Sequence, residues 1–300
     1  MTKKLYIFSV LVSSFLIFSC GSSSSSTNSV RTNPHAEAHM QMHNEFRQEQ
    51  AQKELDEQQK ENMEPSKSEL QKLLLTKYKR GIDFYAVGNE PFWSLDMDFE
   101  KGFHFNTLNG LDFKAPAAKF VKAMDANAIR YKSITESGEI IVQLNQTDCA
   151  DNMSGQEFDY SVTIDFKTSK ETNYKTYKGC GNYVPDFRLH DIWAITEVDG
   201  IKIKPENFKG KLPGIEFNIT ENRVMGNDGC NSFNGSFKTE YKRIFIGNLA
   251  STMMACFENE EISSKIRKIL SNNNLDYTIE NNLLILSKDH KKAMILKHID

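Results

Sequence analysis

Five cysteines are the residues of this 300-residue chain best suited to chemistry: Cys20, Cys149, Cys180, Cys230 and Cys256. A cysteine can be a nucleophile, a metal ligand, a lipid attachment point or half of a disulfide. The redox state of its compartment and its local environment decide among these roles. Cys230 lies in the block GNDGCNSFNG, residues 226–235, which is unusually dense in glycine and asparagine. Its role therefore depends on where the chain resides.

Three histidines form a second candidate site, because His35, His39 and His43 recur at every fourth position. A helix would place them on one face, where imidazoles can chelate zinc or copper, and the nearby Met40 and Met42 would suit Cu(I). Nothing in this polar stretch would fix the orientation of the rings through supporting hydrogen bonds. We therefore favour a polar segment that contains histidines without binding a metal, and we predict no cofactor.

The N-terminus predicts export. Lys3 and Lys4 precede an apolar run of fourteen residues, 5–18, whereas a membrane-spanning helix needs about 20. A short apolar run after positive charges is typical of a secretory signal. The end of the run, Ile17-Phe18-Ser19-Cys20, resembles the bacterial lipobox. That resemblance implies cleavage after residue 19 and acylation of Cys20 with fatty acids such as palmitate. An ordinary signal peptide is the alternative.

Export changes how the other four cysteines are interpreted. An even number of cysteines in an exported chain indicates disulfides, and four allow three connectivities. The formal net charge of −3 gives no basic surface for nucleic acid. We accordingly predict an outer-membrane, lipid-anchored protein of the bacterial cell envelope whose partners do not include nucleic acid.

The chain divides into four parts by composition: a signal peptide (1–19), a lipidated tether (20–80) and two β domains (81–185 and 186–300). The tether begins with a Ser-rich spacer and continues with Gln, Glu and Lys, a composition that is flexible or partly helical. Near its end, SELQKLLLTKY predicts a short helix. The fold class is mainly β, with two small antiparallel domains of which the second carries one packed α-helix.

Strands are predicted where apolar and polar residues alternate. Segments such as FWSLDMDF, EIIVQLNQ and FDYSVTIDF suggest six or so strands in the first domain. In the second, ENEEISSKIRKILSNN predicts a helix, with Ile262, Ile266, Ile269 and Leu270 on one apolar face. The last three strands follow this helix, and the first two of them join at Asn281-Asn282.

The second domain resembles the META, or HslJ-like, domain. The residues that carry the resemblance are IWAITEVDG, VMGNDGCNSFNGSF and LASTMMACFENEE, in that order, between Leu189 and about Ile299. The resemblance implies a small β domain with a packed helix, linked to stress tolerance without an established enzymatic activity. The first domain, with GNEPFWSLDM, Cys149-Ala150-Asp151-Asn152-Met153-Ser154-Gly155 and a late GCG, resembles an uncharacterised family of envelope lipoproteins.

Against this background the cysteines are predicted to be structural. No histidine lies in the blocks around Cys230 to act as a base, and no C-x2-4-C pair suggests zinc. Cys230 and Cys256 bracket the predicted hairpin GSFKTEYKRIFIGN, so we expect them to pair. The same logic pairs Cys149 with Cys180 inside the first domain.

The remaining polar and aromatic candidates are interpreted as structural. Asp151 is expected to cap a turn. Asp96, Asp98 and Glu100 alternate along a strand and are expected to face solvent. The aromatic residues are expected to lie in the core: Phe92, Trp93 and Trp193.

No set of residues in the sequence has the pattern of a catalytic site. We therefore predict a non-enzymatic envelope lipoprotein that binds another envelope protein or component, a class that includes inhibitors of hydrolases. The alternative is an envelope lipoprotein that binds a small ligand or a metal. An exposed apolar patch would favour the first function, and a concave, polar-lined pocket would favour the second.

Overall fold

The computed structural model describes residues 50, 52–53, 67–118, 120–122, 128–208, 211–255 and 259–299. The signal peptide, Cys20, the three histidines of the tether and Cys256 lie outside these residues, so the predictions about them stay predictions. The first long element described is helix α2, Lys67–Lys79, which confirms the helix expected from SELQKLLLTKY. Among the helices that the structure describes, none combines the length and apolar character that a membrane crossing requires.

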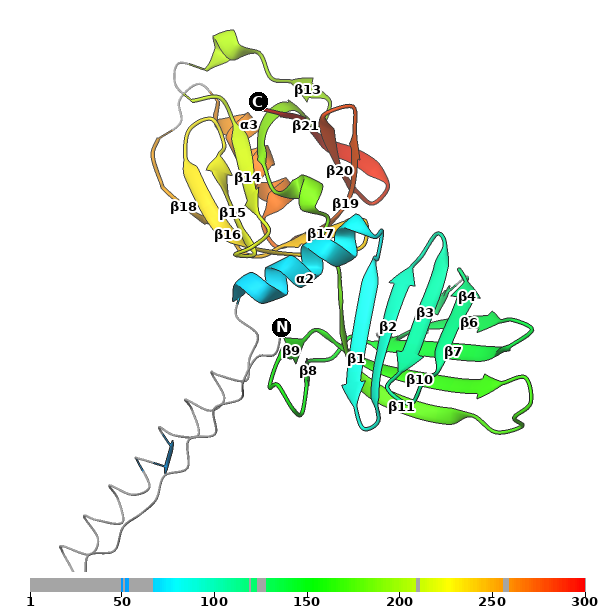
Figure 1. Ribbon diagram of the computed structural model, residues 1–300. Coiled ribbons are helices and arrows are strands. Elements are labelled where there is room, and N and C mark those ends of the chain that lie inside the picture. Colours follow the sequence, from blue (N-terminus) through cyan, green and yellow to red (C-terminus); the bar gives the residue numbers. More distant parts are fainter. Residues whose placement is uncertain are drawn as a thin grey trace, which may run out of the picture. The chain divides into compact units, whose positions relative to one another are not determined.

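An antiparallel sheet of nine strands curves into a half-barrel after α2 (Figure 1). Its strands lie in the order β4-β3-β2-β1-β11-β10-β7-β6-β5. In chain order they are β1 (Phe84–Asn89), β2 (Phe92–Asp98), β3 (Gly102–Thr107), β4 (Asp112–Pro116), β5 (Phe120–Lys122), β6 (Ala128–Ile134), β7 (Gly138–Asn145), β10 (Tyr160–Thr168) and β11 (Lys175–Tyr183). Between β7 and β10 the chain forms a separate two-stranded ribbon from β8 (Cys149–Ala150) and β9 (Glu157–Phe158). The sheet has more strands than the six or so predicted.

Strict alternation explains why β10, one of the two longest strands of the half-barrel, forms. Along β10, residues alternate between buried and partly exposed, so Val162, Ile164 and Phe166 face the core. A strand with this period buries one face and leaves the other to solvent. The same core cluster is rich in aromatic residues, with Phe84, Trp93, Phe105 and Phe113 among its buried members.

The second sheet closes on itself into a barrel. Its strands follow the order β12-β14-β15-β16-β17-β19-β20-β21, and β21 pairs again with β12. Their bounds are β12 (Ile192–Val198), β14 (Gly214–Asn218), β15 (Arg223–Asn227), β16 (Ser232–Glu240), β17 (Arg243–Ile246), β19 (Asn273–Glu280), β20 (Leu283–Lys288) and β21 (Lys291–His298). Two short strands lie at the margins: β13 (Ile201–Lys202) pairs with β12, and β18 (Ala250–Ser251) pairs with β16. Single-turn helices span Phe187–Leu189 and Pro205–Asn207.

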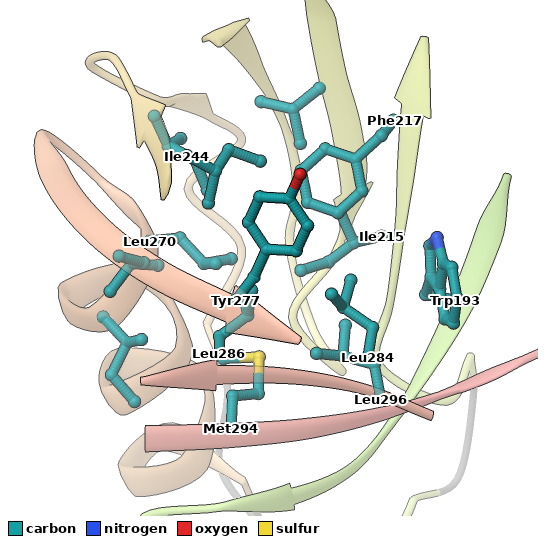
Figure 2. Close-up of a cluster of buried hydrophobic side chains, with 14 of the residues drawn as sticks. Trp193, Ile215, Phe217, Ile244, Leu270, Tyr277, Leu284, Leu286, Met294 and Leu296 are labelled. Carbon is teal, nitrogen blue, oxygen red and sulfur yellow. The ribbon is translucent and has the colours of Figure 1, made fainter. Parts of the chain in front are cut away.

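Helix α3, Glu260–Leu270, covers part of the core of this barrel. Ile266, Ile269 and Leu270 are buried and Ile262 packs against the same cluster, so the predicted apolar face is confirmed. Each such side chain contributes roughly 1.5–3 kcal/mol when fully buried. Figure 2 shows Leu270 beside the side chains of the barrel strands, with the ring of Tyr277 among them.

Tight turns connect the closing strands as their residue types demand. Asn281 and Asn282 have φ values of 51° and 61°, so the predicted junction is confirmed as the turn between β19 and β20. Asp289 and His290, with φ values of 49° and 61°, make the same kind of turn between β20 and β21. Asn and Asp tolerate this left-handed conformation better than most residues, which suits the two-residue hairpin.

Candidate functional site

The GNDGCN block folds around the buried side chain of Asp228. Its Oδ1 accepts hydrogen bonds from the backbone N–H groups of Cys230 (2.9 Å) and Asn231 (2.7 Å). Its Oδ2 pairs with the guanidinium of Arg267 on α3. The backbone oxygen of Asp228 accepts a hydrogen bond from the hydroxyl of Ser263 at 2.9 Å. This aspartate therefore joins the loop to the helix, and both of its carboxylate oxygens are engaged in doing so.

Asn231 holds a second loop in the same way. Its side-chain Oδ1 accepts from the backbone N–H of Met254 at 2.7 Å and from the hydroxyl of Thr252 at 2.9 Å. Its Nδ2 donates to the carbonyl of Met254 at 3.3 Å. The backbone is thereby fixed while the side chains point outward: Met253 is 99% exposed and Met254 is 60% exposed. We call residues 252–254 the methionine loop.

Cys230 is disulfide-bonded, which removes it as a nucleophile. The predicted partner, Cys256, lies outside the described residues, so that pairing stays a prediction. The Sγ atom of Cys230 also lies 3.5 Å from Nδ2 of Asn231 and 3.9 Å from the carbonyl oxygen of Met254. The cysteine is thus placed beside the methionine loop that Asn231 holds.

In the half-barrel, two sequence blocks meet at Asn89 and Asp151. The amide of Asn89 donates to Oδ2 of Asp151 at 2.6 Å. Oδ1 of Asp151 accepts from the backbone N–H groups of Met153 (3.1 Å) and Ser154 (2.7 Å) and from the Ser154 hydroxyl (2.8 Å). Burial alone would raise the pKa of Asp151, but these hydrogen bonds together lower it below its ordinary value. The expected turn-capping role of Asp151 is confirmed.

The third sequence block of the half-barrel, GCG at residues 179–181, is linked to the block that contains Asp151. A disulfide links Cys149 to Cys180, as predicted, with their Cα atoms 5.6 Å apart. The indole of Trp93 packs beside Gly179, where an added Cβ would come within 2.7 Å of the ring and 2.0 Å of the Val87 carbonyl oxygen. Only glycine fits this close approach. The absence of a side chain at Gly179 lets β11 lie close to β1 and leaves room for the Trp93 ring.

Three expectations about this region were wrong. Phe92 is 45% exposed, because it starts β2 with its side chain on the face opposite Trp93. Asp98 is buried, not solvated, and its Oδ1 accepts from the backbone of Glu100 (3.0 Å) and Lys101 (2.9 Å) at the turn. Asp96 is largely shielded, since Lys77 of α2 lies 2.6 Å away. Of the three acids, Glu100 is the one that is clearly exposed.

The described residues also form a cleft of about 730 Å³ that the sequence did not suggest. Strand β1, the β8–β9 ribbon and β10 contribute Tyr85, Phe158 and Tyr160 to its lining, and β16 contributes Lys238 and Glu240. Burial raises the pKa of Tyr85 to about 12, so its hydroxyl stays protonated at neutral pH. No local pattern marks such a cleft, because its lining residues are distant in sequence.

Two polar contacts cross this region. The hydroxyl of Tyr160 donates to Oε1 of Glu240 at 2.8 Å, and Nζ of Lys238 lies 2.6 Å from Oδ1 of Asp159. Burial and the neighbouring carboxylate of Glu240 raise the pKa of Tyr160 well above its usual range. The phenol is therefore a hydrogen-bond donor and not a base at physiological pH.

The described side chains that could ligate a metal are not gathered into one site. Within the described ranges, no group of three or more His, Cys, Asp or Glu side chains is arranged to hold a metal ion. The tether histidines His35, His39 and His43 lie outside those ranges. The two histidines with described ion pairs each face one carboxylate: His104 lies 2.7 Å from Asp112, and His298 lies 2.5 Å from Asp191.

Comparison with known proteins places the second domain in a class. Residues 185–299 match the family model of the META domain, which supports the resemblance seen in the sequence. A solved structure described as "NMR structure of the protein" is similar, with 22% sequence identity and a TM-score of 0.31, over 37% of this chain and 90% of that chain. Comparison with the curated proteins finds no match. This chain thus carries a META domain after a half-barrel domain.

Proposed function

We propose that this protein is a non-enzymatic, lipid-anchored module of the bacterial cell envelope that binds another envelope protein through its methionine loop. The META domain supports a stress-related role in the envelope. The charged N-terminus, the short apolar run and the lipobox-like residues before Cys20 support the anchor. The polar residues of the sequence blocks support binding over catalysis, since Asp228, Asn231 and Asp151 are taken up in internal hydrogen bonds.

The observation that carries the proposal is the exposure of Met253 and Met254 on a fixed backbone. Two adjacent exposed methionines offer apolar surface to a partner, and methionine suits partner surfaces because its thioether chain is flexible and polarisable. Holding the backbone in place before binding reduces the entropy lost on association. The buried Asp228 and Asn231 therefore act as the support of a binding loop.

The charge that follows the methionine loop in the sequence indicates the chemistry of the partner. Glu260 and Glu261 are exposed in the first turn of α3, and Glu261 pairs with Lys265 at 2.8 Å on the surface. An apolar pocket with a basic rim would complement two methionines followed by acidic residues. The partner proposed is a protein with that surface.

Site-specific photocross-linking in the bacterium that produces the protein tests the proposal. A photoreactive amino acid at position 253 should capture one defined envelope protein, and the same group at the exposed Leu108 of the half-barrel (78% exposed) should not. The photoreactive group is then moved to Glu260 and combined with the double variant M253S/M254S. This variant should lose the cross-link, because it removes the apolar side chains but keeps the hydrogen bonds from Asn231 to the loop. The purified partner should then bind the wild-type protein and not the double variant. Equal capture from positions 253 and 108, or unchanged binding by the double variant, would refute the proposal.

The anchor has its own test. Replacing Cys20 by Ala should release the protein from the membrane fraction, and mass spectrometry of the wild-type mature N-terminus should find an acylated cysteine. An unmodified N-terminal cysteine in the wild-type protein would contradict the lipid anchor and leave the proposal for the methionine loop intact.

A further inference from the structure

The cleft lies apart from the methionine loop and has a different chemical character. Its volume of about 730 Å³ falls within the range of about 300–1,000 Å³ that is usual for small-molecule sites. None of residues 252–254 lines it. It therefore offers a second binding surface, whose occupant has to be argued from its own lining.

Aromatic residues line the cleft in two groups. Tyr85, Phe158 and Tyr160 are almost fully buried beneath its surface, and the partly exposed rings of Tyr183 and Phe187 lie beside them. The rings of Tyr85 and Phe158 pack edge to face, with centroids 6.1 Å apart, which holds them in fixed orientations. The buried pair supports the partly exposed rings of Tyr183 and Phe187, which favour an apolar group and also attract cations through the negative charge density above each ring.

The chain itself already places a cation on one of these rings. The ammonium of Lys77 lies 5.1 Å from the centroid of the Tyr85 ring. This contact is within the distance of about 6 Å at which a cation and a ring attract each other. Lys77 pairs with Asp96 at 2.6 Å and does not line the cleft, so its charge is largely offset before a ligand enters.

The ionisable lining of the cleft is predominantly acidic. Among the described residues it carries four carboxylates, Asp148, Glu157, Asp159 and Glu240, against one ammonium group, that of Lys238. Lys238 pairs with Asp159, and Arg243 pairs with Glu240 at 2.9 Å from outside the cleft. The carboxylates of Asp148 and Glu157 belong to exposed residues at the ribbon. These two are the groups that give the cleft a negative field towards an incoming ligand.

We infer that the cleft binds a small organic cation with an apolar portion, such as an amine or a quaternary ammonium compound. The aromatic wall receives the apolar portion, and the rings together with Asp148 and Glu157 stabilise the positive charge. An anionic ligand of the same size meets the same apolar wall but is repelled by the acidic lining. This inference does not rest on the proposed protein-binding function, since the two surfaces share no residue.

The test is an NMR titration of the full chain with benzyltrimethylammonium as the probe, at low ionic strength. Benzenesulfonate, which has a similar ring and the opposite charge, serves as the matched ligand. We expect the cation to bind at least tenfold more tightly than the anion, with the largest shifts at Tyr85, Phe158 and Tyr160. Equal affinities, or shifts centred away from the cleft, would overturn the inference.

Variants of exposed carboxylates test the charge contribution without disturbing the core. The double variant D148N/E157Q should weaken binding of the cation about three- to tenfold. The matched control is E136Q, which removes an exposed carboxylate in the turn between β6 and β7 and should leave the affinity unchanged. The spectrum of each free variant verifies its fold in the same experiment. An unchanged affinity in the double variant, or an equal loss in E136Q, would contradict the assigned site.

Discussion

The side-chain amide of Asn89 donates a 2.6 Å hydrogen bond to Oδ2 of Asp151, a residue 62 positions further along the chain. Asn89 ends β1 within the GNEPFW block, and Asp151 caps the turn of the CADNMSG block. The Cys149–Cys180 disulfide ties the second block to the GCG block of β11. Three blocks that are separate in the sequence thus form one structural unit of the half-barrel.

Replacing Asn89 by Ala should destabilise the half-barrel by about 1–3 kcal/mol, because the variant leaves a buried carboxylate oxygen without its partner. The matched control is Asn152→Ala, an exposed asparagine in the same loop. Urea unfolding followed by tryptophan fluorescence would measure the difference, since Trp93 is buried in this domain. Equal stability of the two variants would show that the bond contributes nothing.

Acidification should weaken the same unit. Hydrogen bonds lower the pKa of Asp151, and those around Asp98 lower its pKa as well, so both carboxylates favour the folded state when ionised. Their contribution is complete above the unfolded value of about 3.9 and is lost as the pH falls through the lower folded value. We expect the melting temperature of the half-barrel to drop below about pH 4. The drop should be shallower in Asp151→Asn, and an identical pH profile for that variant would refute this assignment.

In the META domain, Asp228→Ala should be the costly substitution. It leaves the Arg267 guanidinium without its carboxylate and removes the acceptor for two backbone N–H groups. Breaking a buried pair by removing one partner costs about 3–5 kcal/mol, and we expect the low end because Arg267 is 32% exposed. Glu261→Ala breaks the exposed pair with Lys265 on the same helix and should leave the melting temperature unchanged. Thermal unfolding of both variants compares the two pairs.

Removing the Cys149–Cys180 disulfide should destabilise the half-barrel by about 3–4 kcal/mol in the chain-entropy model for a separation of 31 residues. The double variant C149S/C180S should leave the unfolding of the META domain nearly unchanged. Peptide mapping without reduction would identify the other pairing at the same time. We expect Cys230 joined to Cys256, and recovery of Cys230 with any other partner would contradict the prediction.

Features set by neighbouring residues could be predicted from the sequence. The Asn281-Asn282 turn follows from two residues that tolerate positive φ, and the buried face of α3 follows from the spacing of Ile262, Ile266 and Ile269. The burial of Trp93 and Trp193 and the cap at Asp151 were also predicted correctly. Each of these depends on local conformation or on a short hydrophobic pattern.

Features that depend on residues far apart in the sequence could not be predicted. Strand β11 lacks the alternating pattern of a strand, because Gly179 occupies a position that the Trp93 ring fills from another strand. Asp98 alternates with Asp96 and Glu100 and was expected to face solvent with them. The turn after β2 instead directs two backbone N–H groups at its carboxylate. The cleft combines α2, the half-barrel and β16, so no single segment carries its signature.

The pairing of β12 with β21 has a consequence for how the protein is made. These are the first and last strands of the barrel, and their register joins Trp193 to His298 across nearly the whole META domain. A chain synthesised from its N-terminus must therefore keep one edge of β12 unpaired until β21 emerges. Bringing such distant segments together is entropically costly and slows folding. We expect the barrel to close only after β21 has been synthesised, so a chain that stops short of β21 would expose Trp193 and be a preferred target for the proteases that clear unfinished proteins.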